Sequence, residues 1–152
     1  KNIAALELVR FPSIEDELAG RVSHEAVQNA LADPSTAQAA ALYVALRAVD
    51  SFVATHRRYP GAFDDELAAD LPQLRSAANA VAAQLQLDAS RVSADVLHEV
   101  ARYGGGENHA TAALLGGVAS QEVLKLVTCK WIPFNNTFIY NGIGSNAAVL
   151  KL

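Results

Sequence analysis

The sequence predicts a mainly α-helical fold with a small β part, and three observations support this. The middle of the chain is rich in alanine, and its leucines and valines recur there at helical spacing. Residues 110–127 contain no proline and predict one further long helix. Residues 137–140 are rich in β-forming side chains, and Asn141-Gly142 follows them as a hairpin signal.

The first helices of the middle region are bounded by capping residues and turns. Ser23 is placed to cap a short helix that runs to Leu31. Asp33-Pro34 is a typical helix start, because a capping residue is followed by proline at the first helical position. We expect the helix that begins there to end near His56, ahead of a turn at Pro60-Gly61.

Two more helices are predicted in the same region. Asp70 is the expected cap of one, whose narrow apolar stripe consists of Leu71, Leu74, Ala78, Val81 and Leu85. Ser93 is the expected cap of the other, which contains Val96, Leu97 and Val100. These segments predict a helical bundle joined by polar turns. Residues 2–11 are expected to form a strand or a short helix with no partner nearby in the sequence.

The longest predicted helix has an unusual surface. The three glycines at 104–106 break any preceding helix, and Asn108 is the expected N-cap of the new one. At 100° per residue, three sectors appear. The small-residue stripe contains Ala110, Ala113, Gly116, Gly117 and Ser120; the polar sector contains Gln121, Glu122 and Lys125; the apolar face contains Leu115, Ala119, Val123 and Leu126.

Two adjacent glycines inside a helix cost about 1 kcal/mol each relative to alanine, and close packing is the usual compensation. We therefore expect this helix to be covered on more than one side. The cover is either the core of a larger domain or a subunit interface, and the glycines alone do not decide between them. The candidate interface or close-packing residues are Ala113, Gly116, Gly117, Ser120, Gln121 and Glu122.

A linker and a hairpin are predicted after this helix. Pro133 and Asn135-Asn136 predict a turn. Residues 137–140 predict a strand, residues 141–144 a turn, and residues 147–151 a second strand that returns antiparallel to the first.

Composition narrows the function classes. The chain has 152 residues and a net charge of −4, and its only adjacent basic pair is Arg57-Arg58, so nucleic-acid binding is disfavoured. No run of residues is expected to reach the length of a membrane span, and no secretory signal is visible. The single cysteine, Cys129, forms no intrachain disulfide and favours a reducing, intracellular location.

Residue types that carry chemistry are scattered, and no catalytic, cofactor-binding or metal-binding residue is predicted. The four histidines, at 24, 56, 98 and 109, show no metal-ligand spacing. Cys129 follows an apolar helix, whose dipole disfavours a thiolate at that end, so we interpret it as non-catalytic. The acidic residues at 64–66 lack the pattern of a calcium loop. The glycines at 104–106 lack a P-loop lysine and a dinucleotide fingerprint.

Residues 116–125, Gly-Gly-Val-Ala-Ser-Gln-Glu-Val-Leu-Lys, and residues 133–140, Pro-Phe-Asn-Asn-Thr-Phe-Ile-Tyr, resemble the carboxyl end of ubiquitin-like-protein-activating enzymes. More narrowly, they resemble the regulatory subunit of the neddylation-activating enzyme, which lacks the thioester cysteine. Leu-Arg-Ala-Val-Asp-Ser-Phe at 46–52 and Arg-Tyr-Pro-Gly at 58–61 resemble the helical insertion of that subunit. The resemblance runs from about residue 42 to the end and is looser before it.

The resemblance implies a carboxyl-terminal fragment with two parts. Residues 1–100 correspond to the helical insertion, a catalytic-cysteine-type domain without the cysteine. Residues 101–152 correspond to the last helix and antiparallel hairpin of a Rossmann-like, ThiF/MoeB-type adenylation fold. The Val-Ala-Arg-Tyr-Gly run at 100–104 resembles the return to that fold.

The resemblance also implies a function in the cytoplasm or nucleus. The cysteine-bearing catalytic subunit, with ATP and magnesium, adenylates a ubiquitin-like modifier and forms the thioester, while this subunit supports it. The fragment itself is then non-catalytic and binds no cofactor, nucleic acid or membrane. Two alternatives remain open: a complete adenylating enzyme of another modifier or sulfur-carrier pathway, and a stand-alone helical interaction module.

Overall fold

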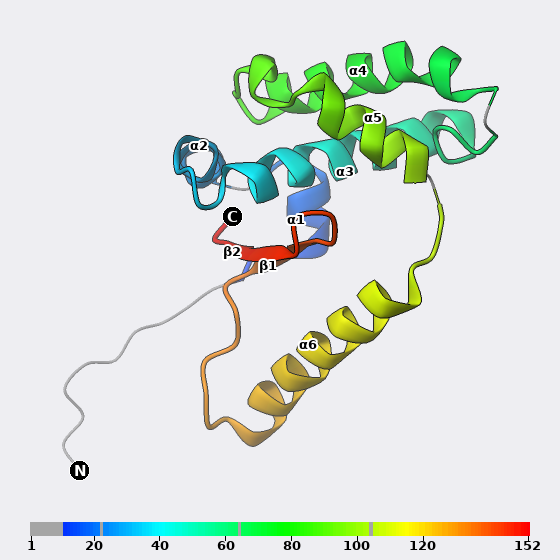
Figure 1. Cartoon of the computed structure of the whole chain (residues 1–152). Helices are drawn as coiled ribbons and strands as arrows, with labels where there is room; N and C mark the ends of the chain where they lie inside the picture. Colours follow the sequence, from blue (N-terminus) through cyan, green and yellow to red (C-terminus); the bar gives the residue numbers. More distant parts are fainter. Residues whose placement is uncertain (1–10, 22, 64, 104) are drawn as a thin grey trace.

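The computed structural model describes residues 11–21, 23–63, 65–103 and 105–152. The elements in chain order are α1 (Ile14–Leu18), α2 (His24–Ala32), α3 (Ala37–His56), α4 (Leu67–Gln84), the 3-10 helix η1 (Ala89–Arg91), α5 (Ala94–Tyr103), α6 (His109–Thr128), β1 (Thr137–Asn141) and β2 (Asn146–Leu150). Figure 1 shows α3, α4 and α5 stacked together, the hairpin beside them and α6 apart. The predicted mainly α fold with a small antiparallel β part is confirmed.

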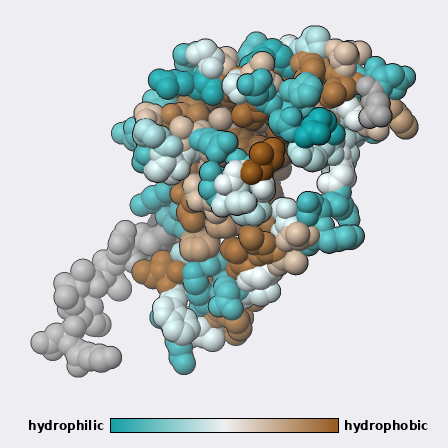
Figure 2. Space-filling model, viewed as in Figure 1, coloured by the Kyte–Doolittle hydropathy of each residue, from teal (hydrophilic) through white to brown (hydrophobic). Residues whose placement is uncertain are grey.

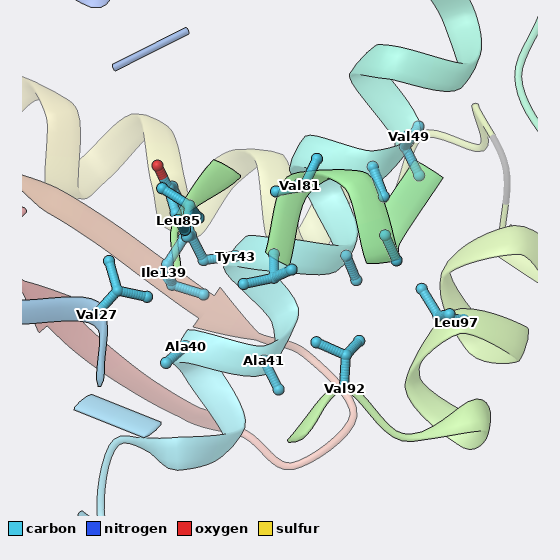
Figure 3. Packing of buried hydrophobic residues seen from close by; sticks show 14 of the residues in the cluster. Val27, Ala40, Ala41, Tyr43, Val49, Val81, Leu85, Val92, Leu97 and Ile139 are labelled. Carbon is cyan, nitrogen blue, oxygen red and sulfur yellow. The ribbon is translucent and has the colours of Figure 1, made fainter. Parts of the chain in front are cut away.

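The core lies where α3, α4 and α5 meet. α3 supplies most of it, since alanines on its inner faces let the neighbouring helices approach, and Val44 and Phe52 fill the space between. Leu74 of α4 and Leu97 of α5 are at most 2% exposed against them. Figure 3 shows side chains from α2, α3, α4, α5 and the hairpin pointing into this one cluster.

The hairpin packs on the helical bundle. β1 and β2 pair antiparallel, with Thr137 opposite Leu150 and Asn141 opposite Asn146. Ile139 and Leu150, together with Leu152 beyond β2, belong to the same buried cluster as α2 and α3. Strands from residues 101–152 thus share a core with helices from residues 1–100, while the division of the chain into two domains at that point stays a prediction.

The start of α3 differs from the expectation. Asp33-Pro34 was the predicted start, but α3 begins at Ala37. The Asp33 carboxylate accepts hydrogen bonds from the amide (2.8 Å) and hydroxyl (2.7 Å) of Ser35, which closes a turn instead of capping a helix. Thr36, the residue before α3, donates its hydroxyl to the Ala30 carbonyl at 2.8 Å and gives no side-chain cap. The predicted end of α3 at His56 is confirmed.

The start of α4 also differs. Asp70 was the predicted cap, but α4 begins three residues earlier, at Leu67, and Asp70 lies within its first turn, only 1% exposed. Its carboxylate does not cap the helix because it is bound by Arg58 and by the amide of Gly61. The prediction was wrong because an ion pair with a distant residue competes with local capping for the same oxygens.

Other local predictions were confirmed and some elements were missed. Ser23, Ser93 and Asn108 each accept a hydrogen bond from an amide in the first turn of the helix that follows. The short helix α1 was missed although Ser13 and Asp16 form a capping box at its start. The strand or helix expected at residues 2–11 lies outside the described residues, except for Phe11.

Candidate functional site

The candidate surface is built on α6. Its N-terminus is fixed by the Asn108 side chain, which accepts hydrogen bonds from the amides of Ala110 (3.0 Å) and Thr111 (3.2 Å). Its C-terminus is closed by Cys129, whose backbone is left-handed (φ 52°) and whose amide donates to the Lys125 carbonyl at 2.9 Å. The helix therefore spans the predicted segment with a residue more at each end.

Within the described part of the chain, α6 buries no residue. The expectation that it is covered on more than one side is therefore not met by this chain itself. A methyl group added at Gly116 or Gly117 meets no described atom within 4 Å, so at these two positions the stripe contacts no described part of the chain. Ala113, Ser120 and Gln121 are likewise exposed. A core inside this chain is excluded for the described residues, and the larger-domain and subunit-interface alternatives both remain predictions.

The predicted apolar face of α6 borders a hollow of about 510 Å³. Leu115, Ala119 and Leu126 line it from the helix, and Phe134 and Phe138 line it from the linker and β1. The rings of Phe134 and Phe138 stack with centroids 5.8 Å apart. This side of α6 is therefore only partly shielded by the chain that follows it.

A second hollow, of about 790 Å³, lies on another side of the same helix. Leu124 of α6 and Trp131 and Ile132 of the linker contribute its apolar lining, and these three side chains are 52%, 66% and 77% exposed. Figure 2 shows hydrophobic residues at the surface in the lower part of the molecule, where α6 and the linker lie. Exposed apolar side chains on two sides of one helix are typical of a surface that another part of the protein or a partner covers.

Glu122 has a role inside the chain that the sequence did not reveal. Its carboxylate accepts a hydrogen bond from Lys125 Nζ at 2.6 Å and another from the Phe134 amide at 2.7 Å. The Lys125 ammonium also lies 4.3 Å from the centre of the Phe134 ring. These contacts, first of all the hydrogen bond from Lys125, hold the pKa of Glu122 below its usual value. Glu122 thus ties the linker to α6, and the only signal for it was the Glu-x-x-Lys spacing.

Both α3 and α6 have the length and apolar composition that would cross a membrane. This corrects the expectation that no run of residues reaches that length. Half of the apolar stretch of α3 is buried in the core, as in core helices of soluble proteins. The apolar stretch of α6 is not buried at all in the described chain. The absence of a membrane partner stays a prediction.

No cluster of metal-binding side chains is found among the described residues. His, Cys, Asp and Glu side chains nowhere gather in a group of three that could hold a metal ion, as far as residues 11–21, 23–63, 65–103 and 105–152 show. Cys129 is exposed and its thiol lies 3.4 Å from the Leu126 carbonyl oxygen.

Comparison with known proteins gives a consistent result. The chain is 38% identical over its full 152 residues to the NEDD8-activating enzyme E1 regulatory subunit AXR1 of Arabidopsis thaliana, and covers 28% of that protein. It is 36% identical to the NEDD8-activating enzyme E1 regulatory subunit of Danio rerio, again with 100% of this chain and 28% of the relative covered. The Drosophila melanogaster protein of the same name is 44% identical over 108 residues, 71% of this chain and 20% of the relative. No family model matches the chain.

Proposed function

Since the chain is homologous over its whole length to the carboxyl-terminal part of NEDD8-activating enzyme E1 regulatory subunits, we propose that it works as a segment of such a subunit. The chain spans 28% of the length of these two relatives. In this proposal the whole protein supports a separate catalytic subunit in activating a NEDD8-type ubiquitin-like modifier. The proposal rests on the similarity over all 152 residues of this chain. That similarity favours neither an activator of another pathway nor a stand-alone helical module.

We further propose that the chemistry takes place on the partner. The partner supplies the acceptor cysteine, and ATP and magnesium are used there to adenylate the carboxyl terminus of the modifier. The position of Cys129 supports this division, because Cys129 lies at the C-terminal end of α6, whereas helix N-termini are the ends that activate a nucleophilic cysteine.

The uncovered α6 supports a second element of the proposal. A helix with apolar side chains on two sides and a stripe of glycine and alanine on a third is suited to burial. We propose that α6 and the hairpin are the last elements of a Rossmann-like, ThiF/MoeB-type fold, and that the remainder of the subunit or the catalytic partner covers α6. Ala113, Gly116, Gly117 and Ser120 are then the points of closest approach.

The test uses the regulatory subunit that contains this chain, mixed with the cysteine-bearing activating subunit. Mass photometry is expected to show a stable complex, and detection of separate subunits only would refute the proposal. Gly117→Leu is expected to lower partner affinity at least tenfold with an unchanged melting temperature if the stripe is an intersubunit surface. A lowered melting temperature with unchanged affinity places the stripe inside the subunit instead. Ala80→Leu, which adds the same side chain at an exposed position of α4, is the matched control.

A further inference from the structure

The turn between α3 and α4 contacts the place where the chain leaves the bundle for α6. The ring of Tyr59 lies directly over Gly105, two residues after the end of α5. A methyl group at Gly105 would come within 2.7 Å of Tyr59 Cδ2 and 3.1 Å of Cε2, which is closer than side chains pack. Only glycine therefore fits beneath this ring without displacing it.

The same turn also contacts α5 itself. Gly61 has a left-handed backbone (φ 64°), and the position of a side chain there is occupied by the carbonyl of Ala101, in the last turn of α5. Ala101 is fully buried, so this carbonyl is held in place by the core. The residues 58–61 thus contact the chain on both sides of the α5 exit.

Asp70 anchors the turn to the bundle. Its two carboxylate oxygens accept hydrogen bonds from Arg58 Nη1 (2.5 Å) and Nη2 (2.8 Å), and one also accepts from the Gly61 amide at 2.9 Å. The Arg58 guanidinium lies 5.5 Å from the centre of the Phe52 ring, which is itself buried. A bidentate ion pair to a buried carboxylate fixes both the distance and the orientation of the arginine. The turn is therefore tied to the core through the buried Asp70, although the Tyr59 ring itself is half exposed.

From these contacts we propose that residues 58–61 act as a latch that sets the direction of the connection from α5 to α6, and so the position of α6 relative to the bundle. α6 buries no residue of its own in the described chain, so its position depends on contacts at its two ends and on the linker and hairpin beside it. Glu122 and the linker act at the C-terminal end, and the latch acts at the N-terminal end. The inference concerns this chain's own conformation and does not depend on the proposed function.

The experiment measures the distance between the bundle and α6 in the full chain. Spin labels on Cys129, at the end of α6, and on Ser76→Cys, an exposed position of α4, report it by pulsed electron resonance. Gly105→Ala is expected to shift or broaden the distance distribution by several ångströms while the melting temperature stays within about 2 °C of the parent. Gly116→Ala adds the same methyl group where no described atom lies within 4 Å and is expected to leave the distribution unchanged.

A second pair of variants tests whether the clash with the Tyr59 ring causes the change in distance, or whether Gly105→Ala disturbs the connection in another way. Tyr59→Ala removes the ring, and adding Gly105→Ala to it is expected to have no further effect. An unchanged distribution in Gly105→Ala alone, or an equal shift in the presence and absence of Tyr59, would overturn the latch. Asp70→Asn is expected to broaden the distribution as well, and a parent-like distribution in that variant would equally contradict the anchoring role.

Discussion

Two leucines on different helices provide the sharpest test of how far α6 is separated from the core. Leu74 of α4 is fully buried, whereas Leu124 of α6 is 52% exposed and borders an open hollow. Both lie inside long helices, and leucine and alanine have similar helix propensities. The substitutions Leu74→Ala and Leu124→Ala therefore differ almost only in what surrounds the side chain.

The expected effects follow from burial. Leu74→Ala removes buried methyl groups and leaves a cavity, which lowers the free energy of unfolding by about 2–5 kcal/mol. Full burial of a leucine side chain is worth about 1.5–3 kcal/mol, so a half-exposed Leu124 with no cavity term contributes roughly 1 kcal/mol or less. Urea unfolding followed by circular dichroism at 222 nm gives both values, and equal slopes in the two variants show that the comparison is valid.

The reasoning would be refuted if Leu124→Ala destabilised the chain as much as Leu74→Ala does. That outcome would mean that α6 is covered in solution. Repeating the measurement over a hundredfold range of concentration separates the two causes. A second copy of the chain makes the midpoint depend on concentration, whereas an internal contact leaves it constant.

Two further predictions concern ionisable groups. The pKa of Asp70 is held down first by the hydrogen bonds from Arg58 and also by the Gly61 amide, so its stabilising contribution is present above the usual carboxyl pKa of about 3.9 and is lost as pH falls through the lower folded value. Asp70→Asn is therefore expected to lower the urea midpoint at pH 7 and to make it fall less steeply below pH 5, and a parent-like pH profile would contradict this. Glu122→Ala is expected to speed hydrogen exchange of the Phe134 amide at least severalfold without changing the midpoint, because that amide loses its acceptor. Glu107→Ala, a substitution at an exposed acidic position, is the control, and equal exchange in both variants would show that the linker is held by other contacts.

The sequence predicts those parts of the fold that depend on local interactions. Ser23, Ser93 and Asn108 cap helices as expected, because each serves the amides of the turn that follows it. The hairpin is also local, since its two strands are joined by the four residues after Asn141. Periodicity and capping are sufficient for such elements.

The parts that failed depend on residues distant in the sequence. Asp70 has the right residue type for a cap, but Arg58, twelve positions earlier, takes its oxygens. The hydrogen bond from Phe134 to Glu122 similarly joins residues twelve apart. The composition of α6 predicts that the helix is buried, but it does not show which surface would cover the helix. The described chain leaves that surface open.

The packing of the hairpin against α2 and α3 affects the order in which the chain folds. Asn146 donates to Gln38 at 3.1 Å across 108 positions, and Leu150 joins a cluster with residues such as Val27. Closing a loop of about 100 residues costs roughly 4 kcal/mol of free energy through lost chain entropy, and this cost comes before the contacts that offset it can form. During synthesis the helices can form early, but the cluster is completed only after residues 146–152 have left the ribosome. We therefore expect the bundle to exist first as a loosened helical state, with the hairpin closing it as the late and slow step.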